Sequence, residues 1–230
     1  MRNSISAIIP FYNEGIRIYA VLTAVTKVPS IKQVICVDDG STDDAWKRIK
    51  TEFPNVTLIR LNQNIGKAQA IIEGLRHVYY QNTLLIDGDL IRLKAHELNK
   101  ACKTFISHPS LDMLILKAHG EQRYALVDTL FRNYIIQSGN RILRTKDLQT
   151  IEKRGLTGYQ LEVAINVYMM KHHKIVGWMP VSALNLHKTH KYSFWKGWKE
   201  DLKMDKEIMR YTGLARRIIQ ILFFCRTRIQ

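Results

Sequence analysis

The sequence is poor in cysteine and contains no long hydrophobic run, and these two absences exclude several classes of protein. Its three cysteines, Cys36, Cys102 and Cys225, lie far apart and lack the Cys-x-x-Cys spacing of zinc and redox sites, so we expect neither a disulfide framework nor a zinc centre. No run of eighteen apolar residues occurs, which predicts that no helix spans a membrane. The first residues also lack the apolar region of a signal peptide. We therefore expect a cytoplasmic protein.

Acidic side chains are in short supply relative to basic ones. The 230 residues include 35 Lys and Arg against 20 Asp and Glu, which gives a formal net charge of +15. Such an excess favours anionic partners such as nucleotides, acidic lipid surfaces or nucleic acid, and an ordinary solvated surface is the alternative. No nucleic-acid-binding motif accompanies the charge, so we expect no nucleic acid partner. Hydrophobic residues make up 46% of the chain, enough for a substantial core.

Short apolar runs alternate with helix-like stretches along the chain, which predicts an α/β fold. The expected strands are residues 4–10, 32–37, 56–61, 83–87, 111–116 and 175–181. The expected helices are residues 16–28, 42–53, 67–80, 94–107 and 158–174. Residues 138–151 indicate a turn, a short extended piece and the start of a helix. The apolar runs do not alternate with polar residues, which is typical of strands buried on both faces of a mostly parallel sheet flanked by helices.

Three of these strands end abruptly in polar groups. "IIPFYNE" ends the first strand, "VICVDDGSTD" the second and "LLIDGDL" the fourth. In parallel sheets the ligand binds beyond the carboxyl ends of the strands, so these groups are expected to form one site. Asp87 and Asp89 are oxygen ligands of the kind that Mg²⁺ prefers, although Asp-Gly also favours a plain turn. Asp38 and Asp39 offer acceptors for a ribose or a base.

A fourth motif, "NQNIGKAQAI", places Gly66 and Lys67 at a strand-to-helix junction. A helix N-terminus attracts phosphate, and a lysine there adds a point charge. The spacing is not that of a P-loop, and an exposed lysine is the simpler interpretation of this dipeptide.

Taken together, "IPFYNE", "VDDGSTD", "NIGKAQA" and "DGD", in this order, resemble the family 2 glycosyltransferases. "SGNRILRTKDL", "GYQLEVAINVY" and "VSALNLHKTHK" extend the similarity, which looks most like the polyprenyl-phosphate sugar synthase branch and covers roughly residues 4 to 210. The resemblance implies the GT-A nucleotide-diphospho-sugar transferase fold. It also implies a metal-dependent, hexosyltransferase-like enzyme with a DxD motif and Mg²⁺ or Mn²⁺ as cofactor.

The resemblance also implies a role for each matching residue. Those expected to bind the nucleotide sugar are Pro10, Tyr12, Asn13, Glu14, Asp38, Asp39, Gly66, Lys67, Asp87 and Gly88. The expected metal ligands are Asp87, Asp89 and His187, and His187 is alternatively a surface histidine. The expected catalytic residues are Asp89, Arg141 and Glu162, with Glu162 as general base if the acceptor is a hydroxyl.

Arg141 and Arg144 are expected to contact an acceptor phosphate, since a guanidinium fork matches phosphate geometry; salt bridging is the alternative. The implied reaction is an inverting transfer from a nucleoside-diphosphate sugar to a lipid-linked phosphate or glycolipid. The segment between residues 117 and 138 is shorter than in the lipid-phosphate synthases, so a glycan or soluble acceptor remains an alternative, as does a non-catalytic nucleotide-sugar-binding adaptor. A nucleotidyltransferase is disfavoured because the first strand is not followed by a Gly-rich loop.

The C-terminal part of the chain is basic and amphipathic. We expect residues 1–190 to form the catalytic domain and residues 191–230 a helical extension. The pattern of basic, aromatic and apolar residues favours a helix lying on an anionic membrane surface, which predicts a peripheral protein on the inner face of the membrane. Alternatively, the apolar side chains pack on the catalytic domain or on a second copy in a homodimer.

Overall fold

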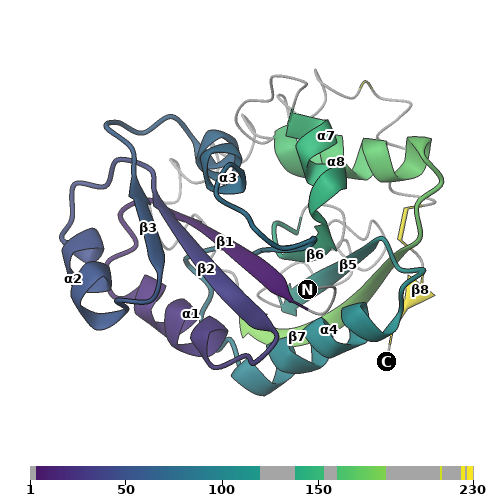
Figure 1. Ribbon diagram of the computed structural model, residues 1–230, viewed down its shortest axis with the longest axis horizontal. Helices are drawn as coiled ribbons and strands as arrows, with labels where there is room; N and C mark the ends of the chain where they lie inside the picture. Colours follow the sequence, from purple (N-terminus) through teal and green to yellow (C-terminus); the bar gives the residue numbers. More distant parts are fainter. Residues whose placement is uncertain are drawn as a thin grey trace.

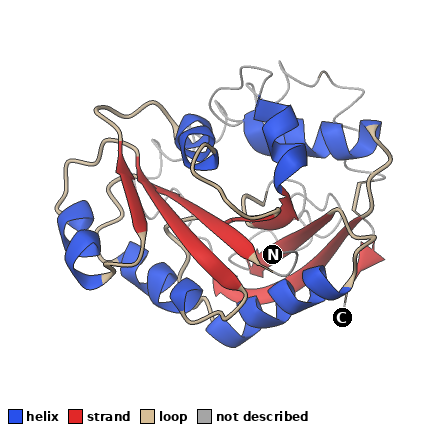
Figure 2. Cartoon of the chain, in the orientation of Figure 1, coloured by secondary structure: helices blue, strands red, loops and turns tan. Residues whose placement is uncertain are grey.

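The structure, a computed structural model, is built around a central sheet that lies between two layers of helices (Figures 1 and 2). The residues that it describes are 4–119, 138–152, 160–184, 213, 224–225 and 227–229. Within these ranges no helix has the length and apolarity needed to cross a membrane.

Eight strands occur among the described residues, in the order β3-β2-β1-β4-β6-β5-β7-β8. Their bounds are β1 Ile5–Phe11, β2 Ile31–Asp38, β3 Thr57–Arg60, β4 Asn82–Leu85, β5 Met113–His119, β6 Arg141–Arg144, β7 Val176–Leu184 and β8 Thr227–Arg228. All neighbours pair in parallel except β6, which runs antiparallel to both β4 and β5. The predicted mostly parallel sheet is therefore confirmed, and the reversed strand within it is an addition that the sequence did not predict.

The helices cover both faces of the sheet. Their bounds are α1 Arg17–Thr26, α2 Ala45–Glu52, α3 Lys67–Leu75, α4 Ala95–Ser107, α7 Thr145–Glu152 and α8 Gln160–Lys171. Side chains of α1, α2 and α4 join one hydrophobic cluster, and those of α3, α7 and α8 join another, so each set covers one face (Figure 1).

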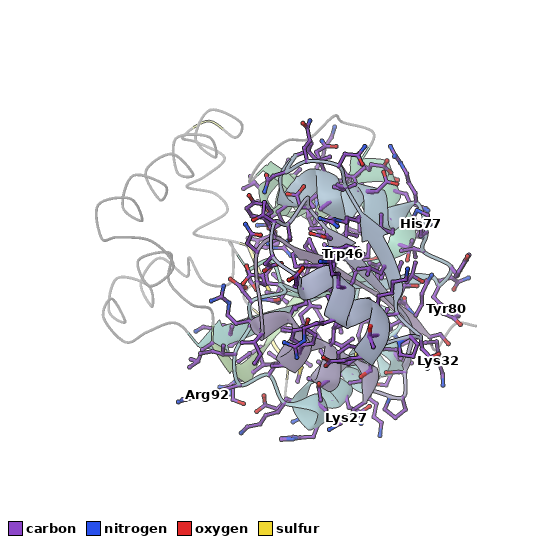
Figure 3. The ribbon with its side chains drawn as sticks, turned by 90° about the vertical axis from the view of Figure 1, so that its left-hand side faces the viewer. Lys27, Lys32, Trp46, His77, Tyr80 and Arg92 are labelled. Carbon is purple, nitrogen blue, oxygen red and sulfur yellow. The ribbon has the colours of Figure 1, made fainter. Side chains whose placement is uncertain are left out.

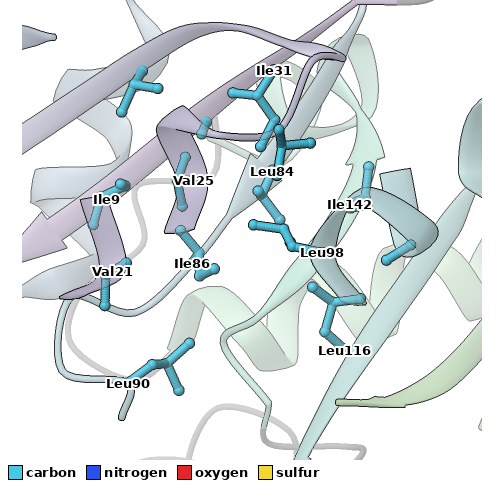
Figure 4. Packing of buried hydrophobic residues seen from close by; sticks show 14 of the residues in the cluster. Ile9, Val21, Val25, Ile31, Leu84, Ile86, Leu90, Leu98, Leu116 and Ile142 are labelled. Carbon is cyan, nitrogen blue, oxygen red and sulfur yellow. The ribbon is translucent and has the colours of Figure 1, made fainter. Parts of the chain in front are cut away.

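Burial on both faces explains why the strands carry unbroken apolar runs. Every residue of β1 is buried, and along this strand Ala7 and Ile9 face the first cluster whereas Ile8 faces the second. Figure 4 shows the first cluster, in which Ile9 and Leu84 from the sheet meet Val25 from α1. Fully burying a side chain of this size contributes roughly 1.5–3 kcal/mol, so this packing is the main source of stability.

The order of strands places a switch point between β1 and β4. From β1 the chain adds β2 and β3 on one side, and it then returns to add β4 on the other side. In open sheets of this kind, the connections diverge at such a point and leave room for a ligand beyond the carboxyl ends. Figure 3 separates the two edges, because Lys32, His77 and Tyr80 lie where strands begin and Arg92 lies beyond the end of β4.

The end of the chain differs from the expected helical extension. Phe224 and Cys225 are buried at 3% and 5% exposure in the cluster of α3, α7 and α8, and the following residues form β8, which pairs with β7. Ile229 packs so closely on Gly177 that a Cβ there would lie 2.6 Å from its Cγ1. The described residues at this end, Phe224, Cys225 and 227–229, therefore pack against the central sheet and its helices. Apart from Gly213, residues 191–223 lie outside the described part.

Candidate active site

The loops that follow β1 and β2 are held together by Asn13. This residue adopts a positive φ of 52°. Its side-chain Oδ1 accepts hydrogen bonds from the backbone N–H groups of Thr42 at 2.8 Å and Asp43 at 3.3 Å. Its own backbone N–H donates to Ser41 Oγ at 2.9 Å. The amide oxygen of Asn13, a residue expected to bind the nucleotide, therefore holds the loop after β1 against the loop after β2.

The other residues of the first motif have different surroundings. Tyr12 leaves β1 with 39% of its surface exposed, so its ring is available to stack on a base. Glu14 pairs with Arg17 Nε at 2.9 Å. Pro10 is buried, and its carbonyl oxygen would lie 3.0 Å from a Cβ placed on Gly88. Gly88 thus lets the turn between Asp87 and Asp89 pack directly against β1.

Asp38 forms a small network with two residues that the sequence interpretation missed. Its carboxylate is fully buried, and one oxygen accepts the backbone N–H of Ser41 at 2.8 Å. The other lies 3.3 Å from Nε of Arg60, whose guanidinium stacks 4.3 Å above the ring of Trp46. Trp46 lies on α2, toward the viewer in Figure 3. No sequence motif identifies Arg60 or Trp46 as part of the site. Arg60 reaches Asp38 because β3 pairs with β2, and Trp46 reaches Arg60 because α2 packs beside β3.

Asp39 joins the loop after β2 to the start of α3. Its two oxygens accept the backbone N–H groups of Ile65 and Gly66, each at 2.9 Å. Burial raises the pKa of Asp39, the two N–H groups lower it, and the nearby Asp38 raises it, so that the pKa lies above its ordinary value. Next to Asp39, Gly40 has a φ of 72°, and a Cβ there would lie 2.5 Å from the carbonyl carbon of Gln63. Three successive loops of the site therefore share one network.

The centre of the site is an ion-pair cluster that we call the Lys67 triad: Lys67, Asp87 and Glu162. Lys67 begins α3, and its Nζ lies 2.7 Å from Oδ1 of Asp87, just beyond β4, and 2.8 Å from Oε1 of Glu162, in the first turn of α8. Burial alone lowers the pKa of Lys67, but the two carboxylates outweigh it and raise that pKa above its ordinary value. The Lys67 side chain remains 35% exposed, so ligands can reach the triad.

Asn140 fixes Asp87 from the other side. Its Oδ1 accepts the backbone N–H of Asp87 at 2.9 Å, and its Nδ2 donates to Oδ2 of the same residue at 3.2 Å. The neighbouring Gly139 makes room for the ion pair between Lys67 and Asp87, since a Cβ there would overlap Lys67 Nζ and lie 2.7 Å from Asp87 Oδ1. Asn140 was not among the predicted residues, although it lies within the "SGNR" motif that was noted.

Arg141 corrects an expectation, because its guanidinium is not presented to an acceptor. The side chain is fully buried, and its N–H groups donate to the carbonyl of Ser138, to Oδ1 of Asn166 at 3.0 Å and to the carbonyl of Glu162 at 3.4 Å. Burial holds the pKa of Arg141 below its ordinary value, although the nearby Glu162 and Asp87 carboxylates partly offset this effect. Arg141 thus supports the backbone that carries Glu162.

Arg144 also differs from the expectation. Along β6 it pairs with Asn82 at the start of β4, whereas Arg141 pairs with Leu85 at the end of β4. Arg144 donates to Asn82 Oδ1 at 2.8 Å and to the carbonyl oxygen of Leu111 at 3.0 Å. Three steps along a strand span about 10 Å, so the reversed strand carries Arg144 to the opposite edge of the sheet.

The two carboxylates of the "DGD" turn suit a hard divalent cation. Asp87 and Asp89 offer oxygen ligands at a ligand-accessible edge, and a Mg²⁺ or Mn²⁺ ion commonly takes one or two carboxylates plus substrate phosphates. Within the described ranges, no three His, Cys, Asp or Glu side chains converge on a metal position. His187, the third expected ligand, lies outside the described residues.

Solved structures with this architecture include those of a sugar-transferring enzyme. Glucosyl-3-phosphoglycerate synthase from Mycobacterium tuberculosis, in complex with phosphoglyceric acid, matches with a TM-score of 0.72 at 16% identity, over 91% of this chain and 80% of that one. Its complex with Mn²⁺, uridine diphosphate and glucosyl-3-phosphoglycerate also gives 0.72 at 16% identity, over 93% and 79% of the two chains. This likeness establishes the GT-A fold.

Relatives that are closer in sequence match a shorter stretch. Dolichyl-phosphate beta-glucosyltransferase of Saccharomyces cerevisiae is 33% identical over 98 residues, which is 37% of this chain and 29% of that protein. Undecaprenyl-phosphate 4-deoxy-4-formamido-L-arabinose transferase of Klebsiella pneumoniae is 31% identical over 94 residues, again 37% and 29%. The chain thus covers less than a third of the length of these relatives. The model of glycosyl transferase family 2 matches residues 6–155, more than half of the chain. The protein therefore belongs to glycosyl transferase family 2.

Proposed function

We propose that this chain transfers a sugar from a nucleoside-diphosphate sugar to an acceptor. The observation that carries the proposal is the Lys67 triad, which brings Asp87 and Glu162 together at the carboxyl edge of the sheet, beside the switch point between β1 and β4. Membership of family 2 supports the same activity.

Asp87 and Asp89 would hold a Mg²⁺ or Mn²⁺ ion together with the donor diphosphate. When bound, such an ion neutralises charge that develops on the departing nucleoside diphosphate. Two solved structures of the M. tuberculosis synthase contain Mn²⁺ or Mg²⁺ with uridine diphosphate, which supports this assignment.

The residues of the chain divide the remaining tasks. The Tyr12 ring and the loops of Asp38 and Asp39 would bind the base and ribose, and Lys67 would contact the phosphates. The acceptor oxygen forms a bond to the anomeric carbon as the bond to the diphosphate oxygen breaks, and the electron pair leaves with the nucleoside diphosphate. This single displacement inverts the anomeric configuration. If the acceptor is a hydroxyl, Glu162 takes its proton; a phosphate acceptor needs no base.

A lipid-linked phosphate is the acceptor that we favour. The names of the S. cerevisiae and K. pneumoniae relatives specify polyprenyl-phosphate acceptors, and a net charge of +15 suits work at an anionic surface. A soluble phosphorylated acceptor is the second candidate, because the M. tuberculosis synthase binds phosphoglyceric acid.

A donor screen tests the activity. Purified protein with Mn²⁺ is given UDP- and GDP-sugars, and nucleoside diphosphate release is followed with polyprenyl phosphate, with 3-phosphoglycerate and with no acceptor. We expect release from one donor class that rises with the lipid phosphate and stops in EDTA. Release that continues unchanged in the chelator contradicts the metal site, and no release under any condition contradicts the proposed enzyme.

His187 is a proposed third metal ligand, and chain length allows it. Leu184 and Ile91 exchange backbone hydrogen bonds at 2.9 and 3.1 Å, so β7 ends beside the residue two positions after Asp89. His187 follows Leu184 by three residues, a span of at most about 10 Å. We expect His187→Ala to reduce Mn²⁺-dependent turnover by about tenfold or more, since losing a ligand weakens metal binding.

The matched control for this prediction is His190→Ala, three residues further along the same basic stretch. It should retain nearly all activity at every Mn²⁺ concentration. If the two variants show equal and small losses across a Mn²⁺ titration, His187 is not a ligand.

A further inference from the structure

We propose that Lys67 is an exchangeable internal cation: it occupies Asp87 before the metal arrives and moves to the donor phosphates afterwards. The proposal rests on the proposed function, and it concerns how the metal site of that function is kept ready. Its basis is that one ammonium group bridges a carboxylate of the "DGD" turn and a carboxylate of α8.

The first argument is that Asp87 has no uncommitted oxygen. Its Oδ1 lies 2.7 Å from Lys67 Nζ, and its Oδ2 accepts the amide of Asn140 at 3.2 Å. A divalent cation bound to Oδ1 would lie about 2.1 Å from that oxygen, and therefore no more than about 5 Å from the ammonium. Two positive groups at such a distance repel strongly in a partly buried site. Metal binding to Asp87 in this geometry therefore favours movement of Lys67 away from that carboxylate.

The second argument is that Lys67 has somewhere to go. It is the first residue of α3, and 35% of its side chain is exposed. The N-terminus of a helix attracts phosphate through its free N–H groups and its dipole. A lysine side chain carries a compact charge on a flexible stem of four carbons. Rotation about the bonds of this stem can turn the ammonium from Asp87 toward a diphosphate without movement of the helix.

The third argument concerns charge balance. The triad contains two carboxylates and one ammonium, so removing the ammonium alone would leave Asp87 and Glu162 with the buried Arg141 guanidinium as the remaining nearby positive charge. A divalent cation compensates Asp87, and the phosphates that accompany it compensate the displaced ammonium. Metal and donor together can therefore replace Lys67 at Asp87, whereas the metal alone must compete with the ammonium for this carboxylate. The expected behaviour is weak metal binding without donor.

The test is a titration of the full chain with Mn²⁺ alone, in which free Mn²⁺ is followed by electron paramagnetic resonance. Lys67→Met is expected to bind Mn²⁺ about tenfold or more tightly than the unsubstituted protein, because the competing cation is gone. Lys67→Arg keeps the charge and should bind as weakly as the unsubstituted protein. Lys27→Met removes the same charge from an exposed position after α1, at the edge where strands begin, and should change nothing (Figure 3).

Folding and the proposed function are separated by two further variants. If Lys67→Met does not fold by circular dichroism, Lys67→Gln retains a hydrogen-bond donor between the carboxylates and makes the same comparison. Asp89→Asn is then added to whichever variant is used. Mn²⁺ binding that does not depend on Asp89 overturns the metal site itself. Binding that depends on Asp89 and is no tighter without the lysine overturns only the exchange.

Discussion

Asp89→Asn is expected to reduce glycosyl transfer by about 10³-fold while leaving the fold intact. The ion that Asp89 would help to hold is worth several kcal/mol of transition-state stabilisation, and each 1.4 kcal/mol is about tenfold in rate. The substitution keeps the size of the side chain and removes its charge. Asp89 lies in the turn after β4 and is only partly buried, so little packing is lost. Initial rates at saturating donor measure the loss of transfer, and a thermal unfolding curve shows whether the fold is intact.

The control is Asp44→Asn, which removes the same charge at the start of α2. Its side chain is 75% exposed and pairs only at the surface, with Lys47 at 2.7 Å, so its activity should stay within twofold of the unsubstituted protein. A folded Asp89→Asn variant with normal turnover would refute the assignment of Asp89 to the metal site.

Arg141→Met is expected to reduce the free energy of unfolding by about 3 kcal/mol or more. The guanidinium is fully buried, and its removal deletes the hydrogen bonds that it donates to the carbonyl of Ser138 and to Oδ1 of Asn166. Each buried polar group left unpaired costs about 1–3 kcal/mol. Arg141→Lys keeps the charge but cannot reach all of these acceptors, so it should lose stability as well. Urea-induced unfolding measures both.

Arg76→Met supplies the comparison, since that arginine is exposed at the end of α3 and should change stability by less than about 0.5 kcal/mol. The alternative role of Arg141, direct contact with an acceptor phosphate, makes the opposite prediction. In that case Arg141→Met would be as stable as the unsubstituted protein, inactive, and partly rescued by Arg141→Lys.

The parts of the fold that depend on local pattern could be predicted from the sequence. An unbroken apolar run identifies a strand buried on both faces, and β1, β2 and β7 lie within one to three residues of their expected bounds. The edge of the sheet at which Asp87 and Asp39 lie follows from parallel pairing alone. The family resemblance then identified Glu162 as a further site residue. Its Oε1 lies 2.8 Å from Lys67 Nζ, although the two residues are far apart in sequence.

What could not be predicted depends on strand direction and on contacts between distant segments. The motif "SGNRILR" contains two arginines three residues apart, and nothing local shows that β6 is antiparallel. That single reversal buries Arg141 beneath α8 and carries Arg144 to the far edge. The role of Asn140 could not be predicted for a related reason. It contacts Asp87 only because β6 lies beside the end of β4.

The network around Asp39 restricts how the loops of the proposed donor site could be re-engineered. Residues 13, 39–43 and 63–66 come from three separate stretches of sequence, yet they share hydrogen bonds and a glycine contact too close for any larger side chain. A loop taken from a relative and inserted after β2 alone would have to reproduce the contacts of Asp39 and Gly40 with residues 63–66. We therefore expect loop exchanges to preserve the network when the three segments are moved together, and to lose some of its hydrogen bonds when one segment is varied alone.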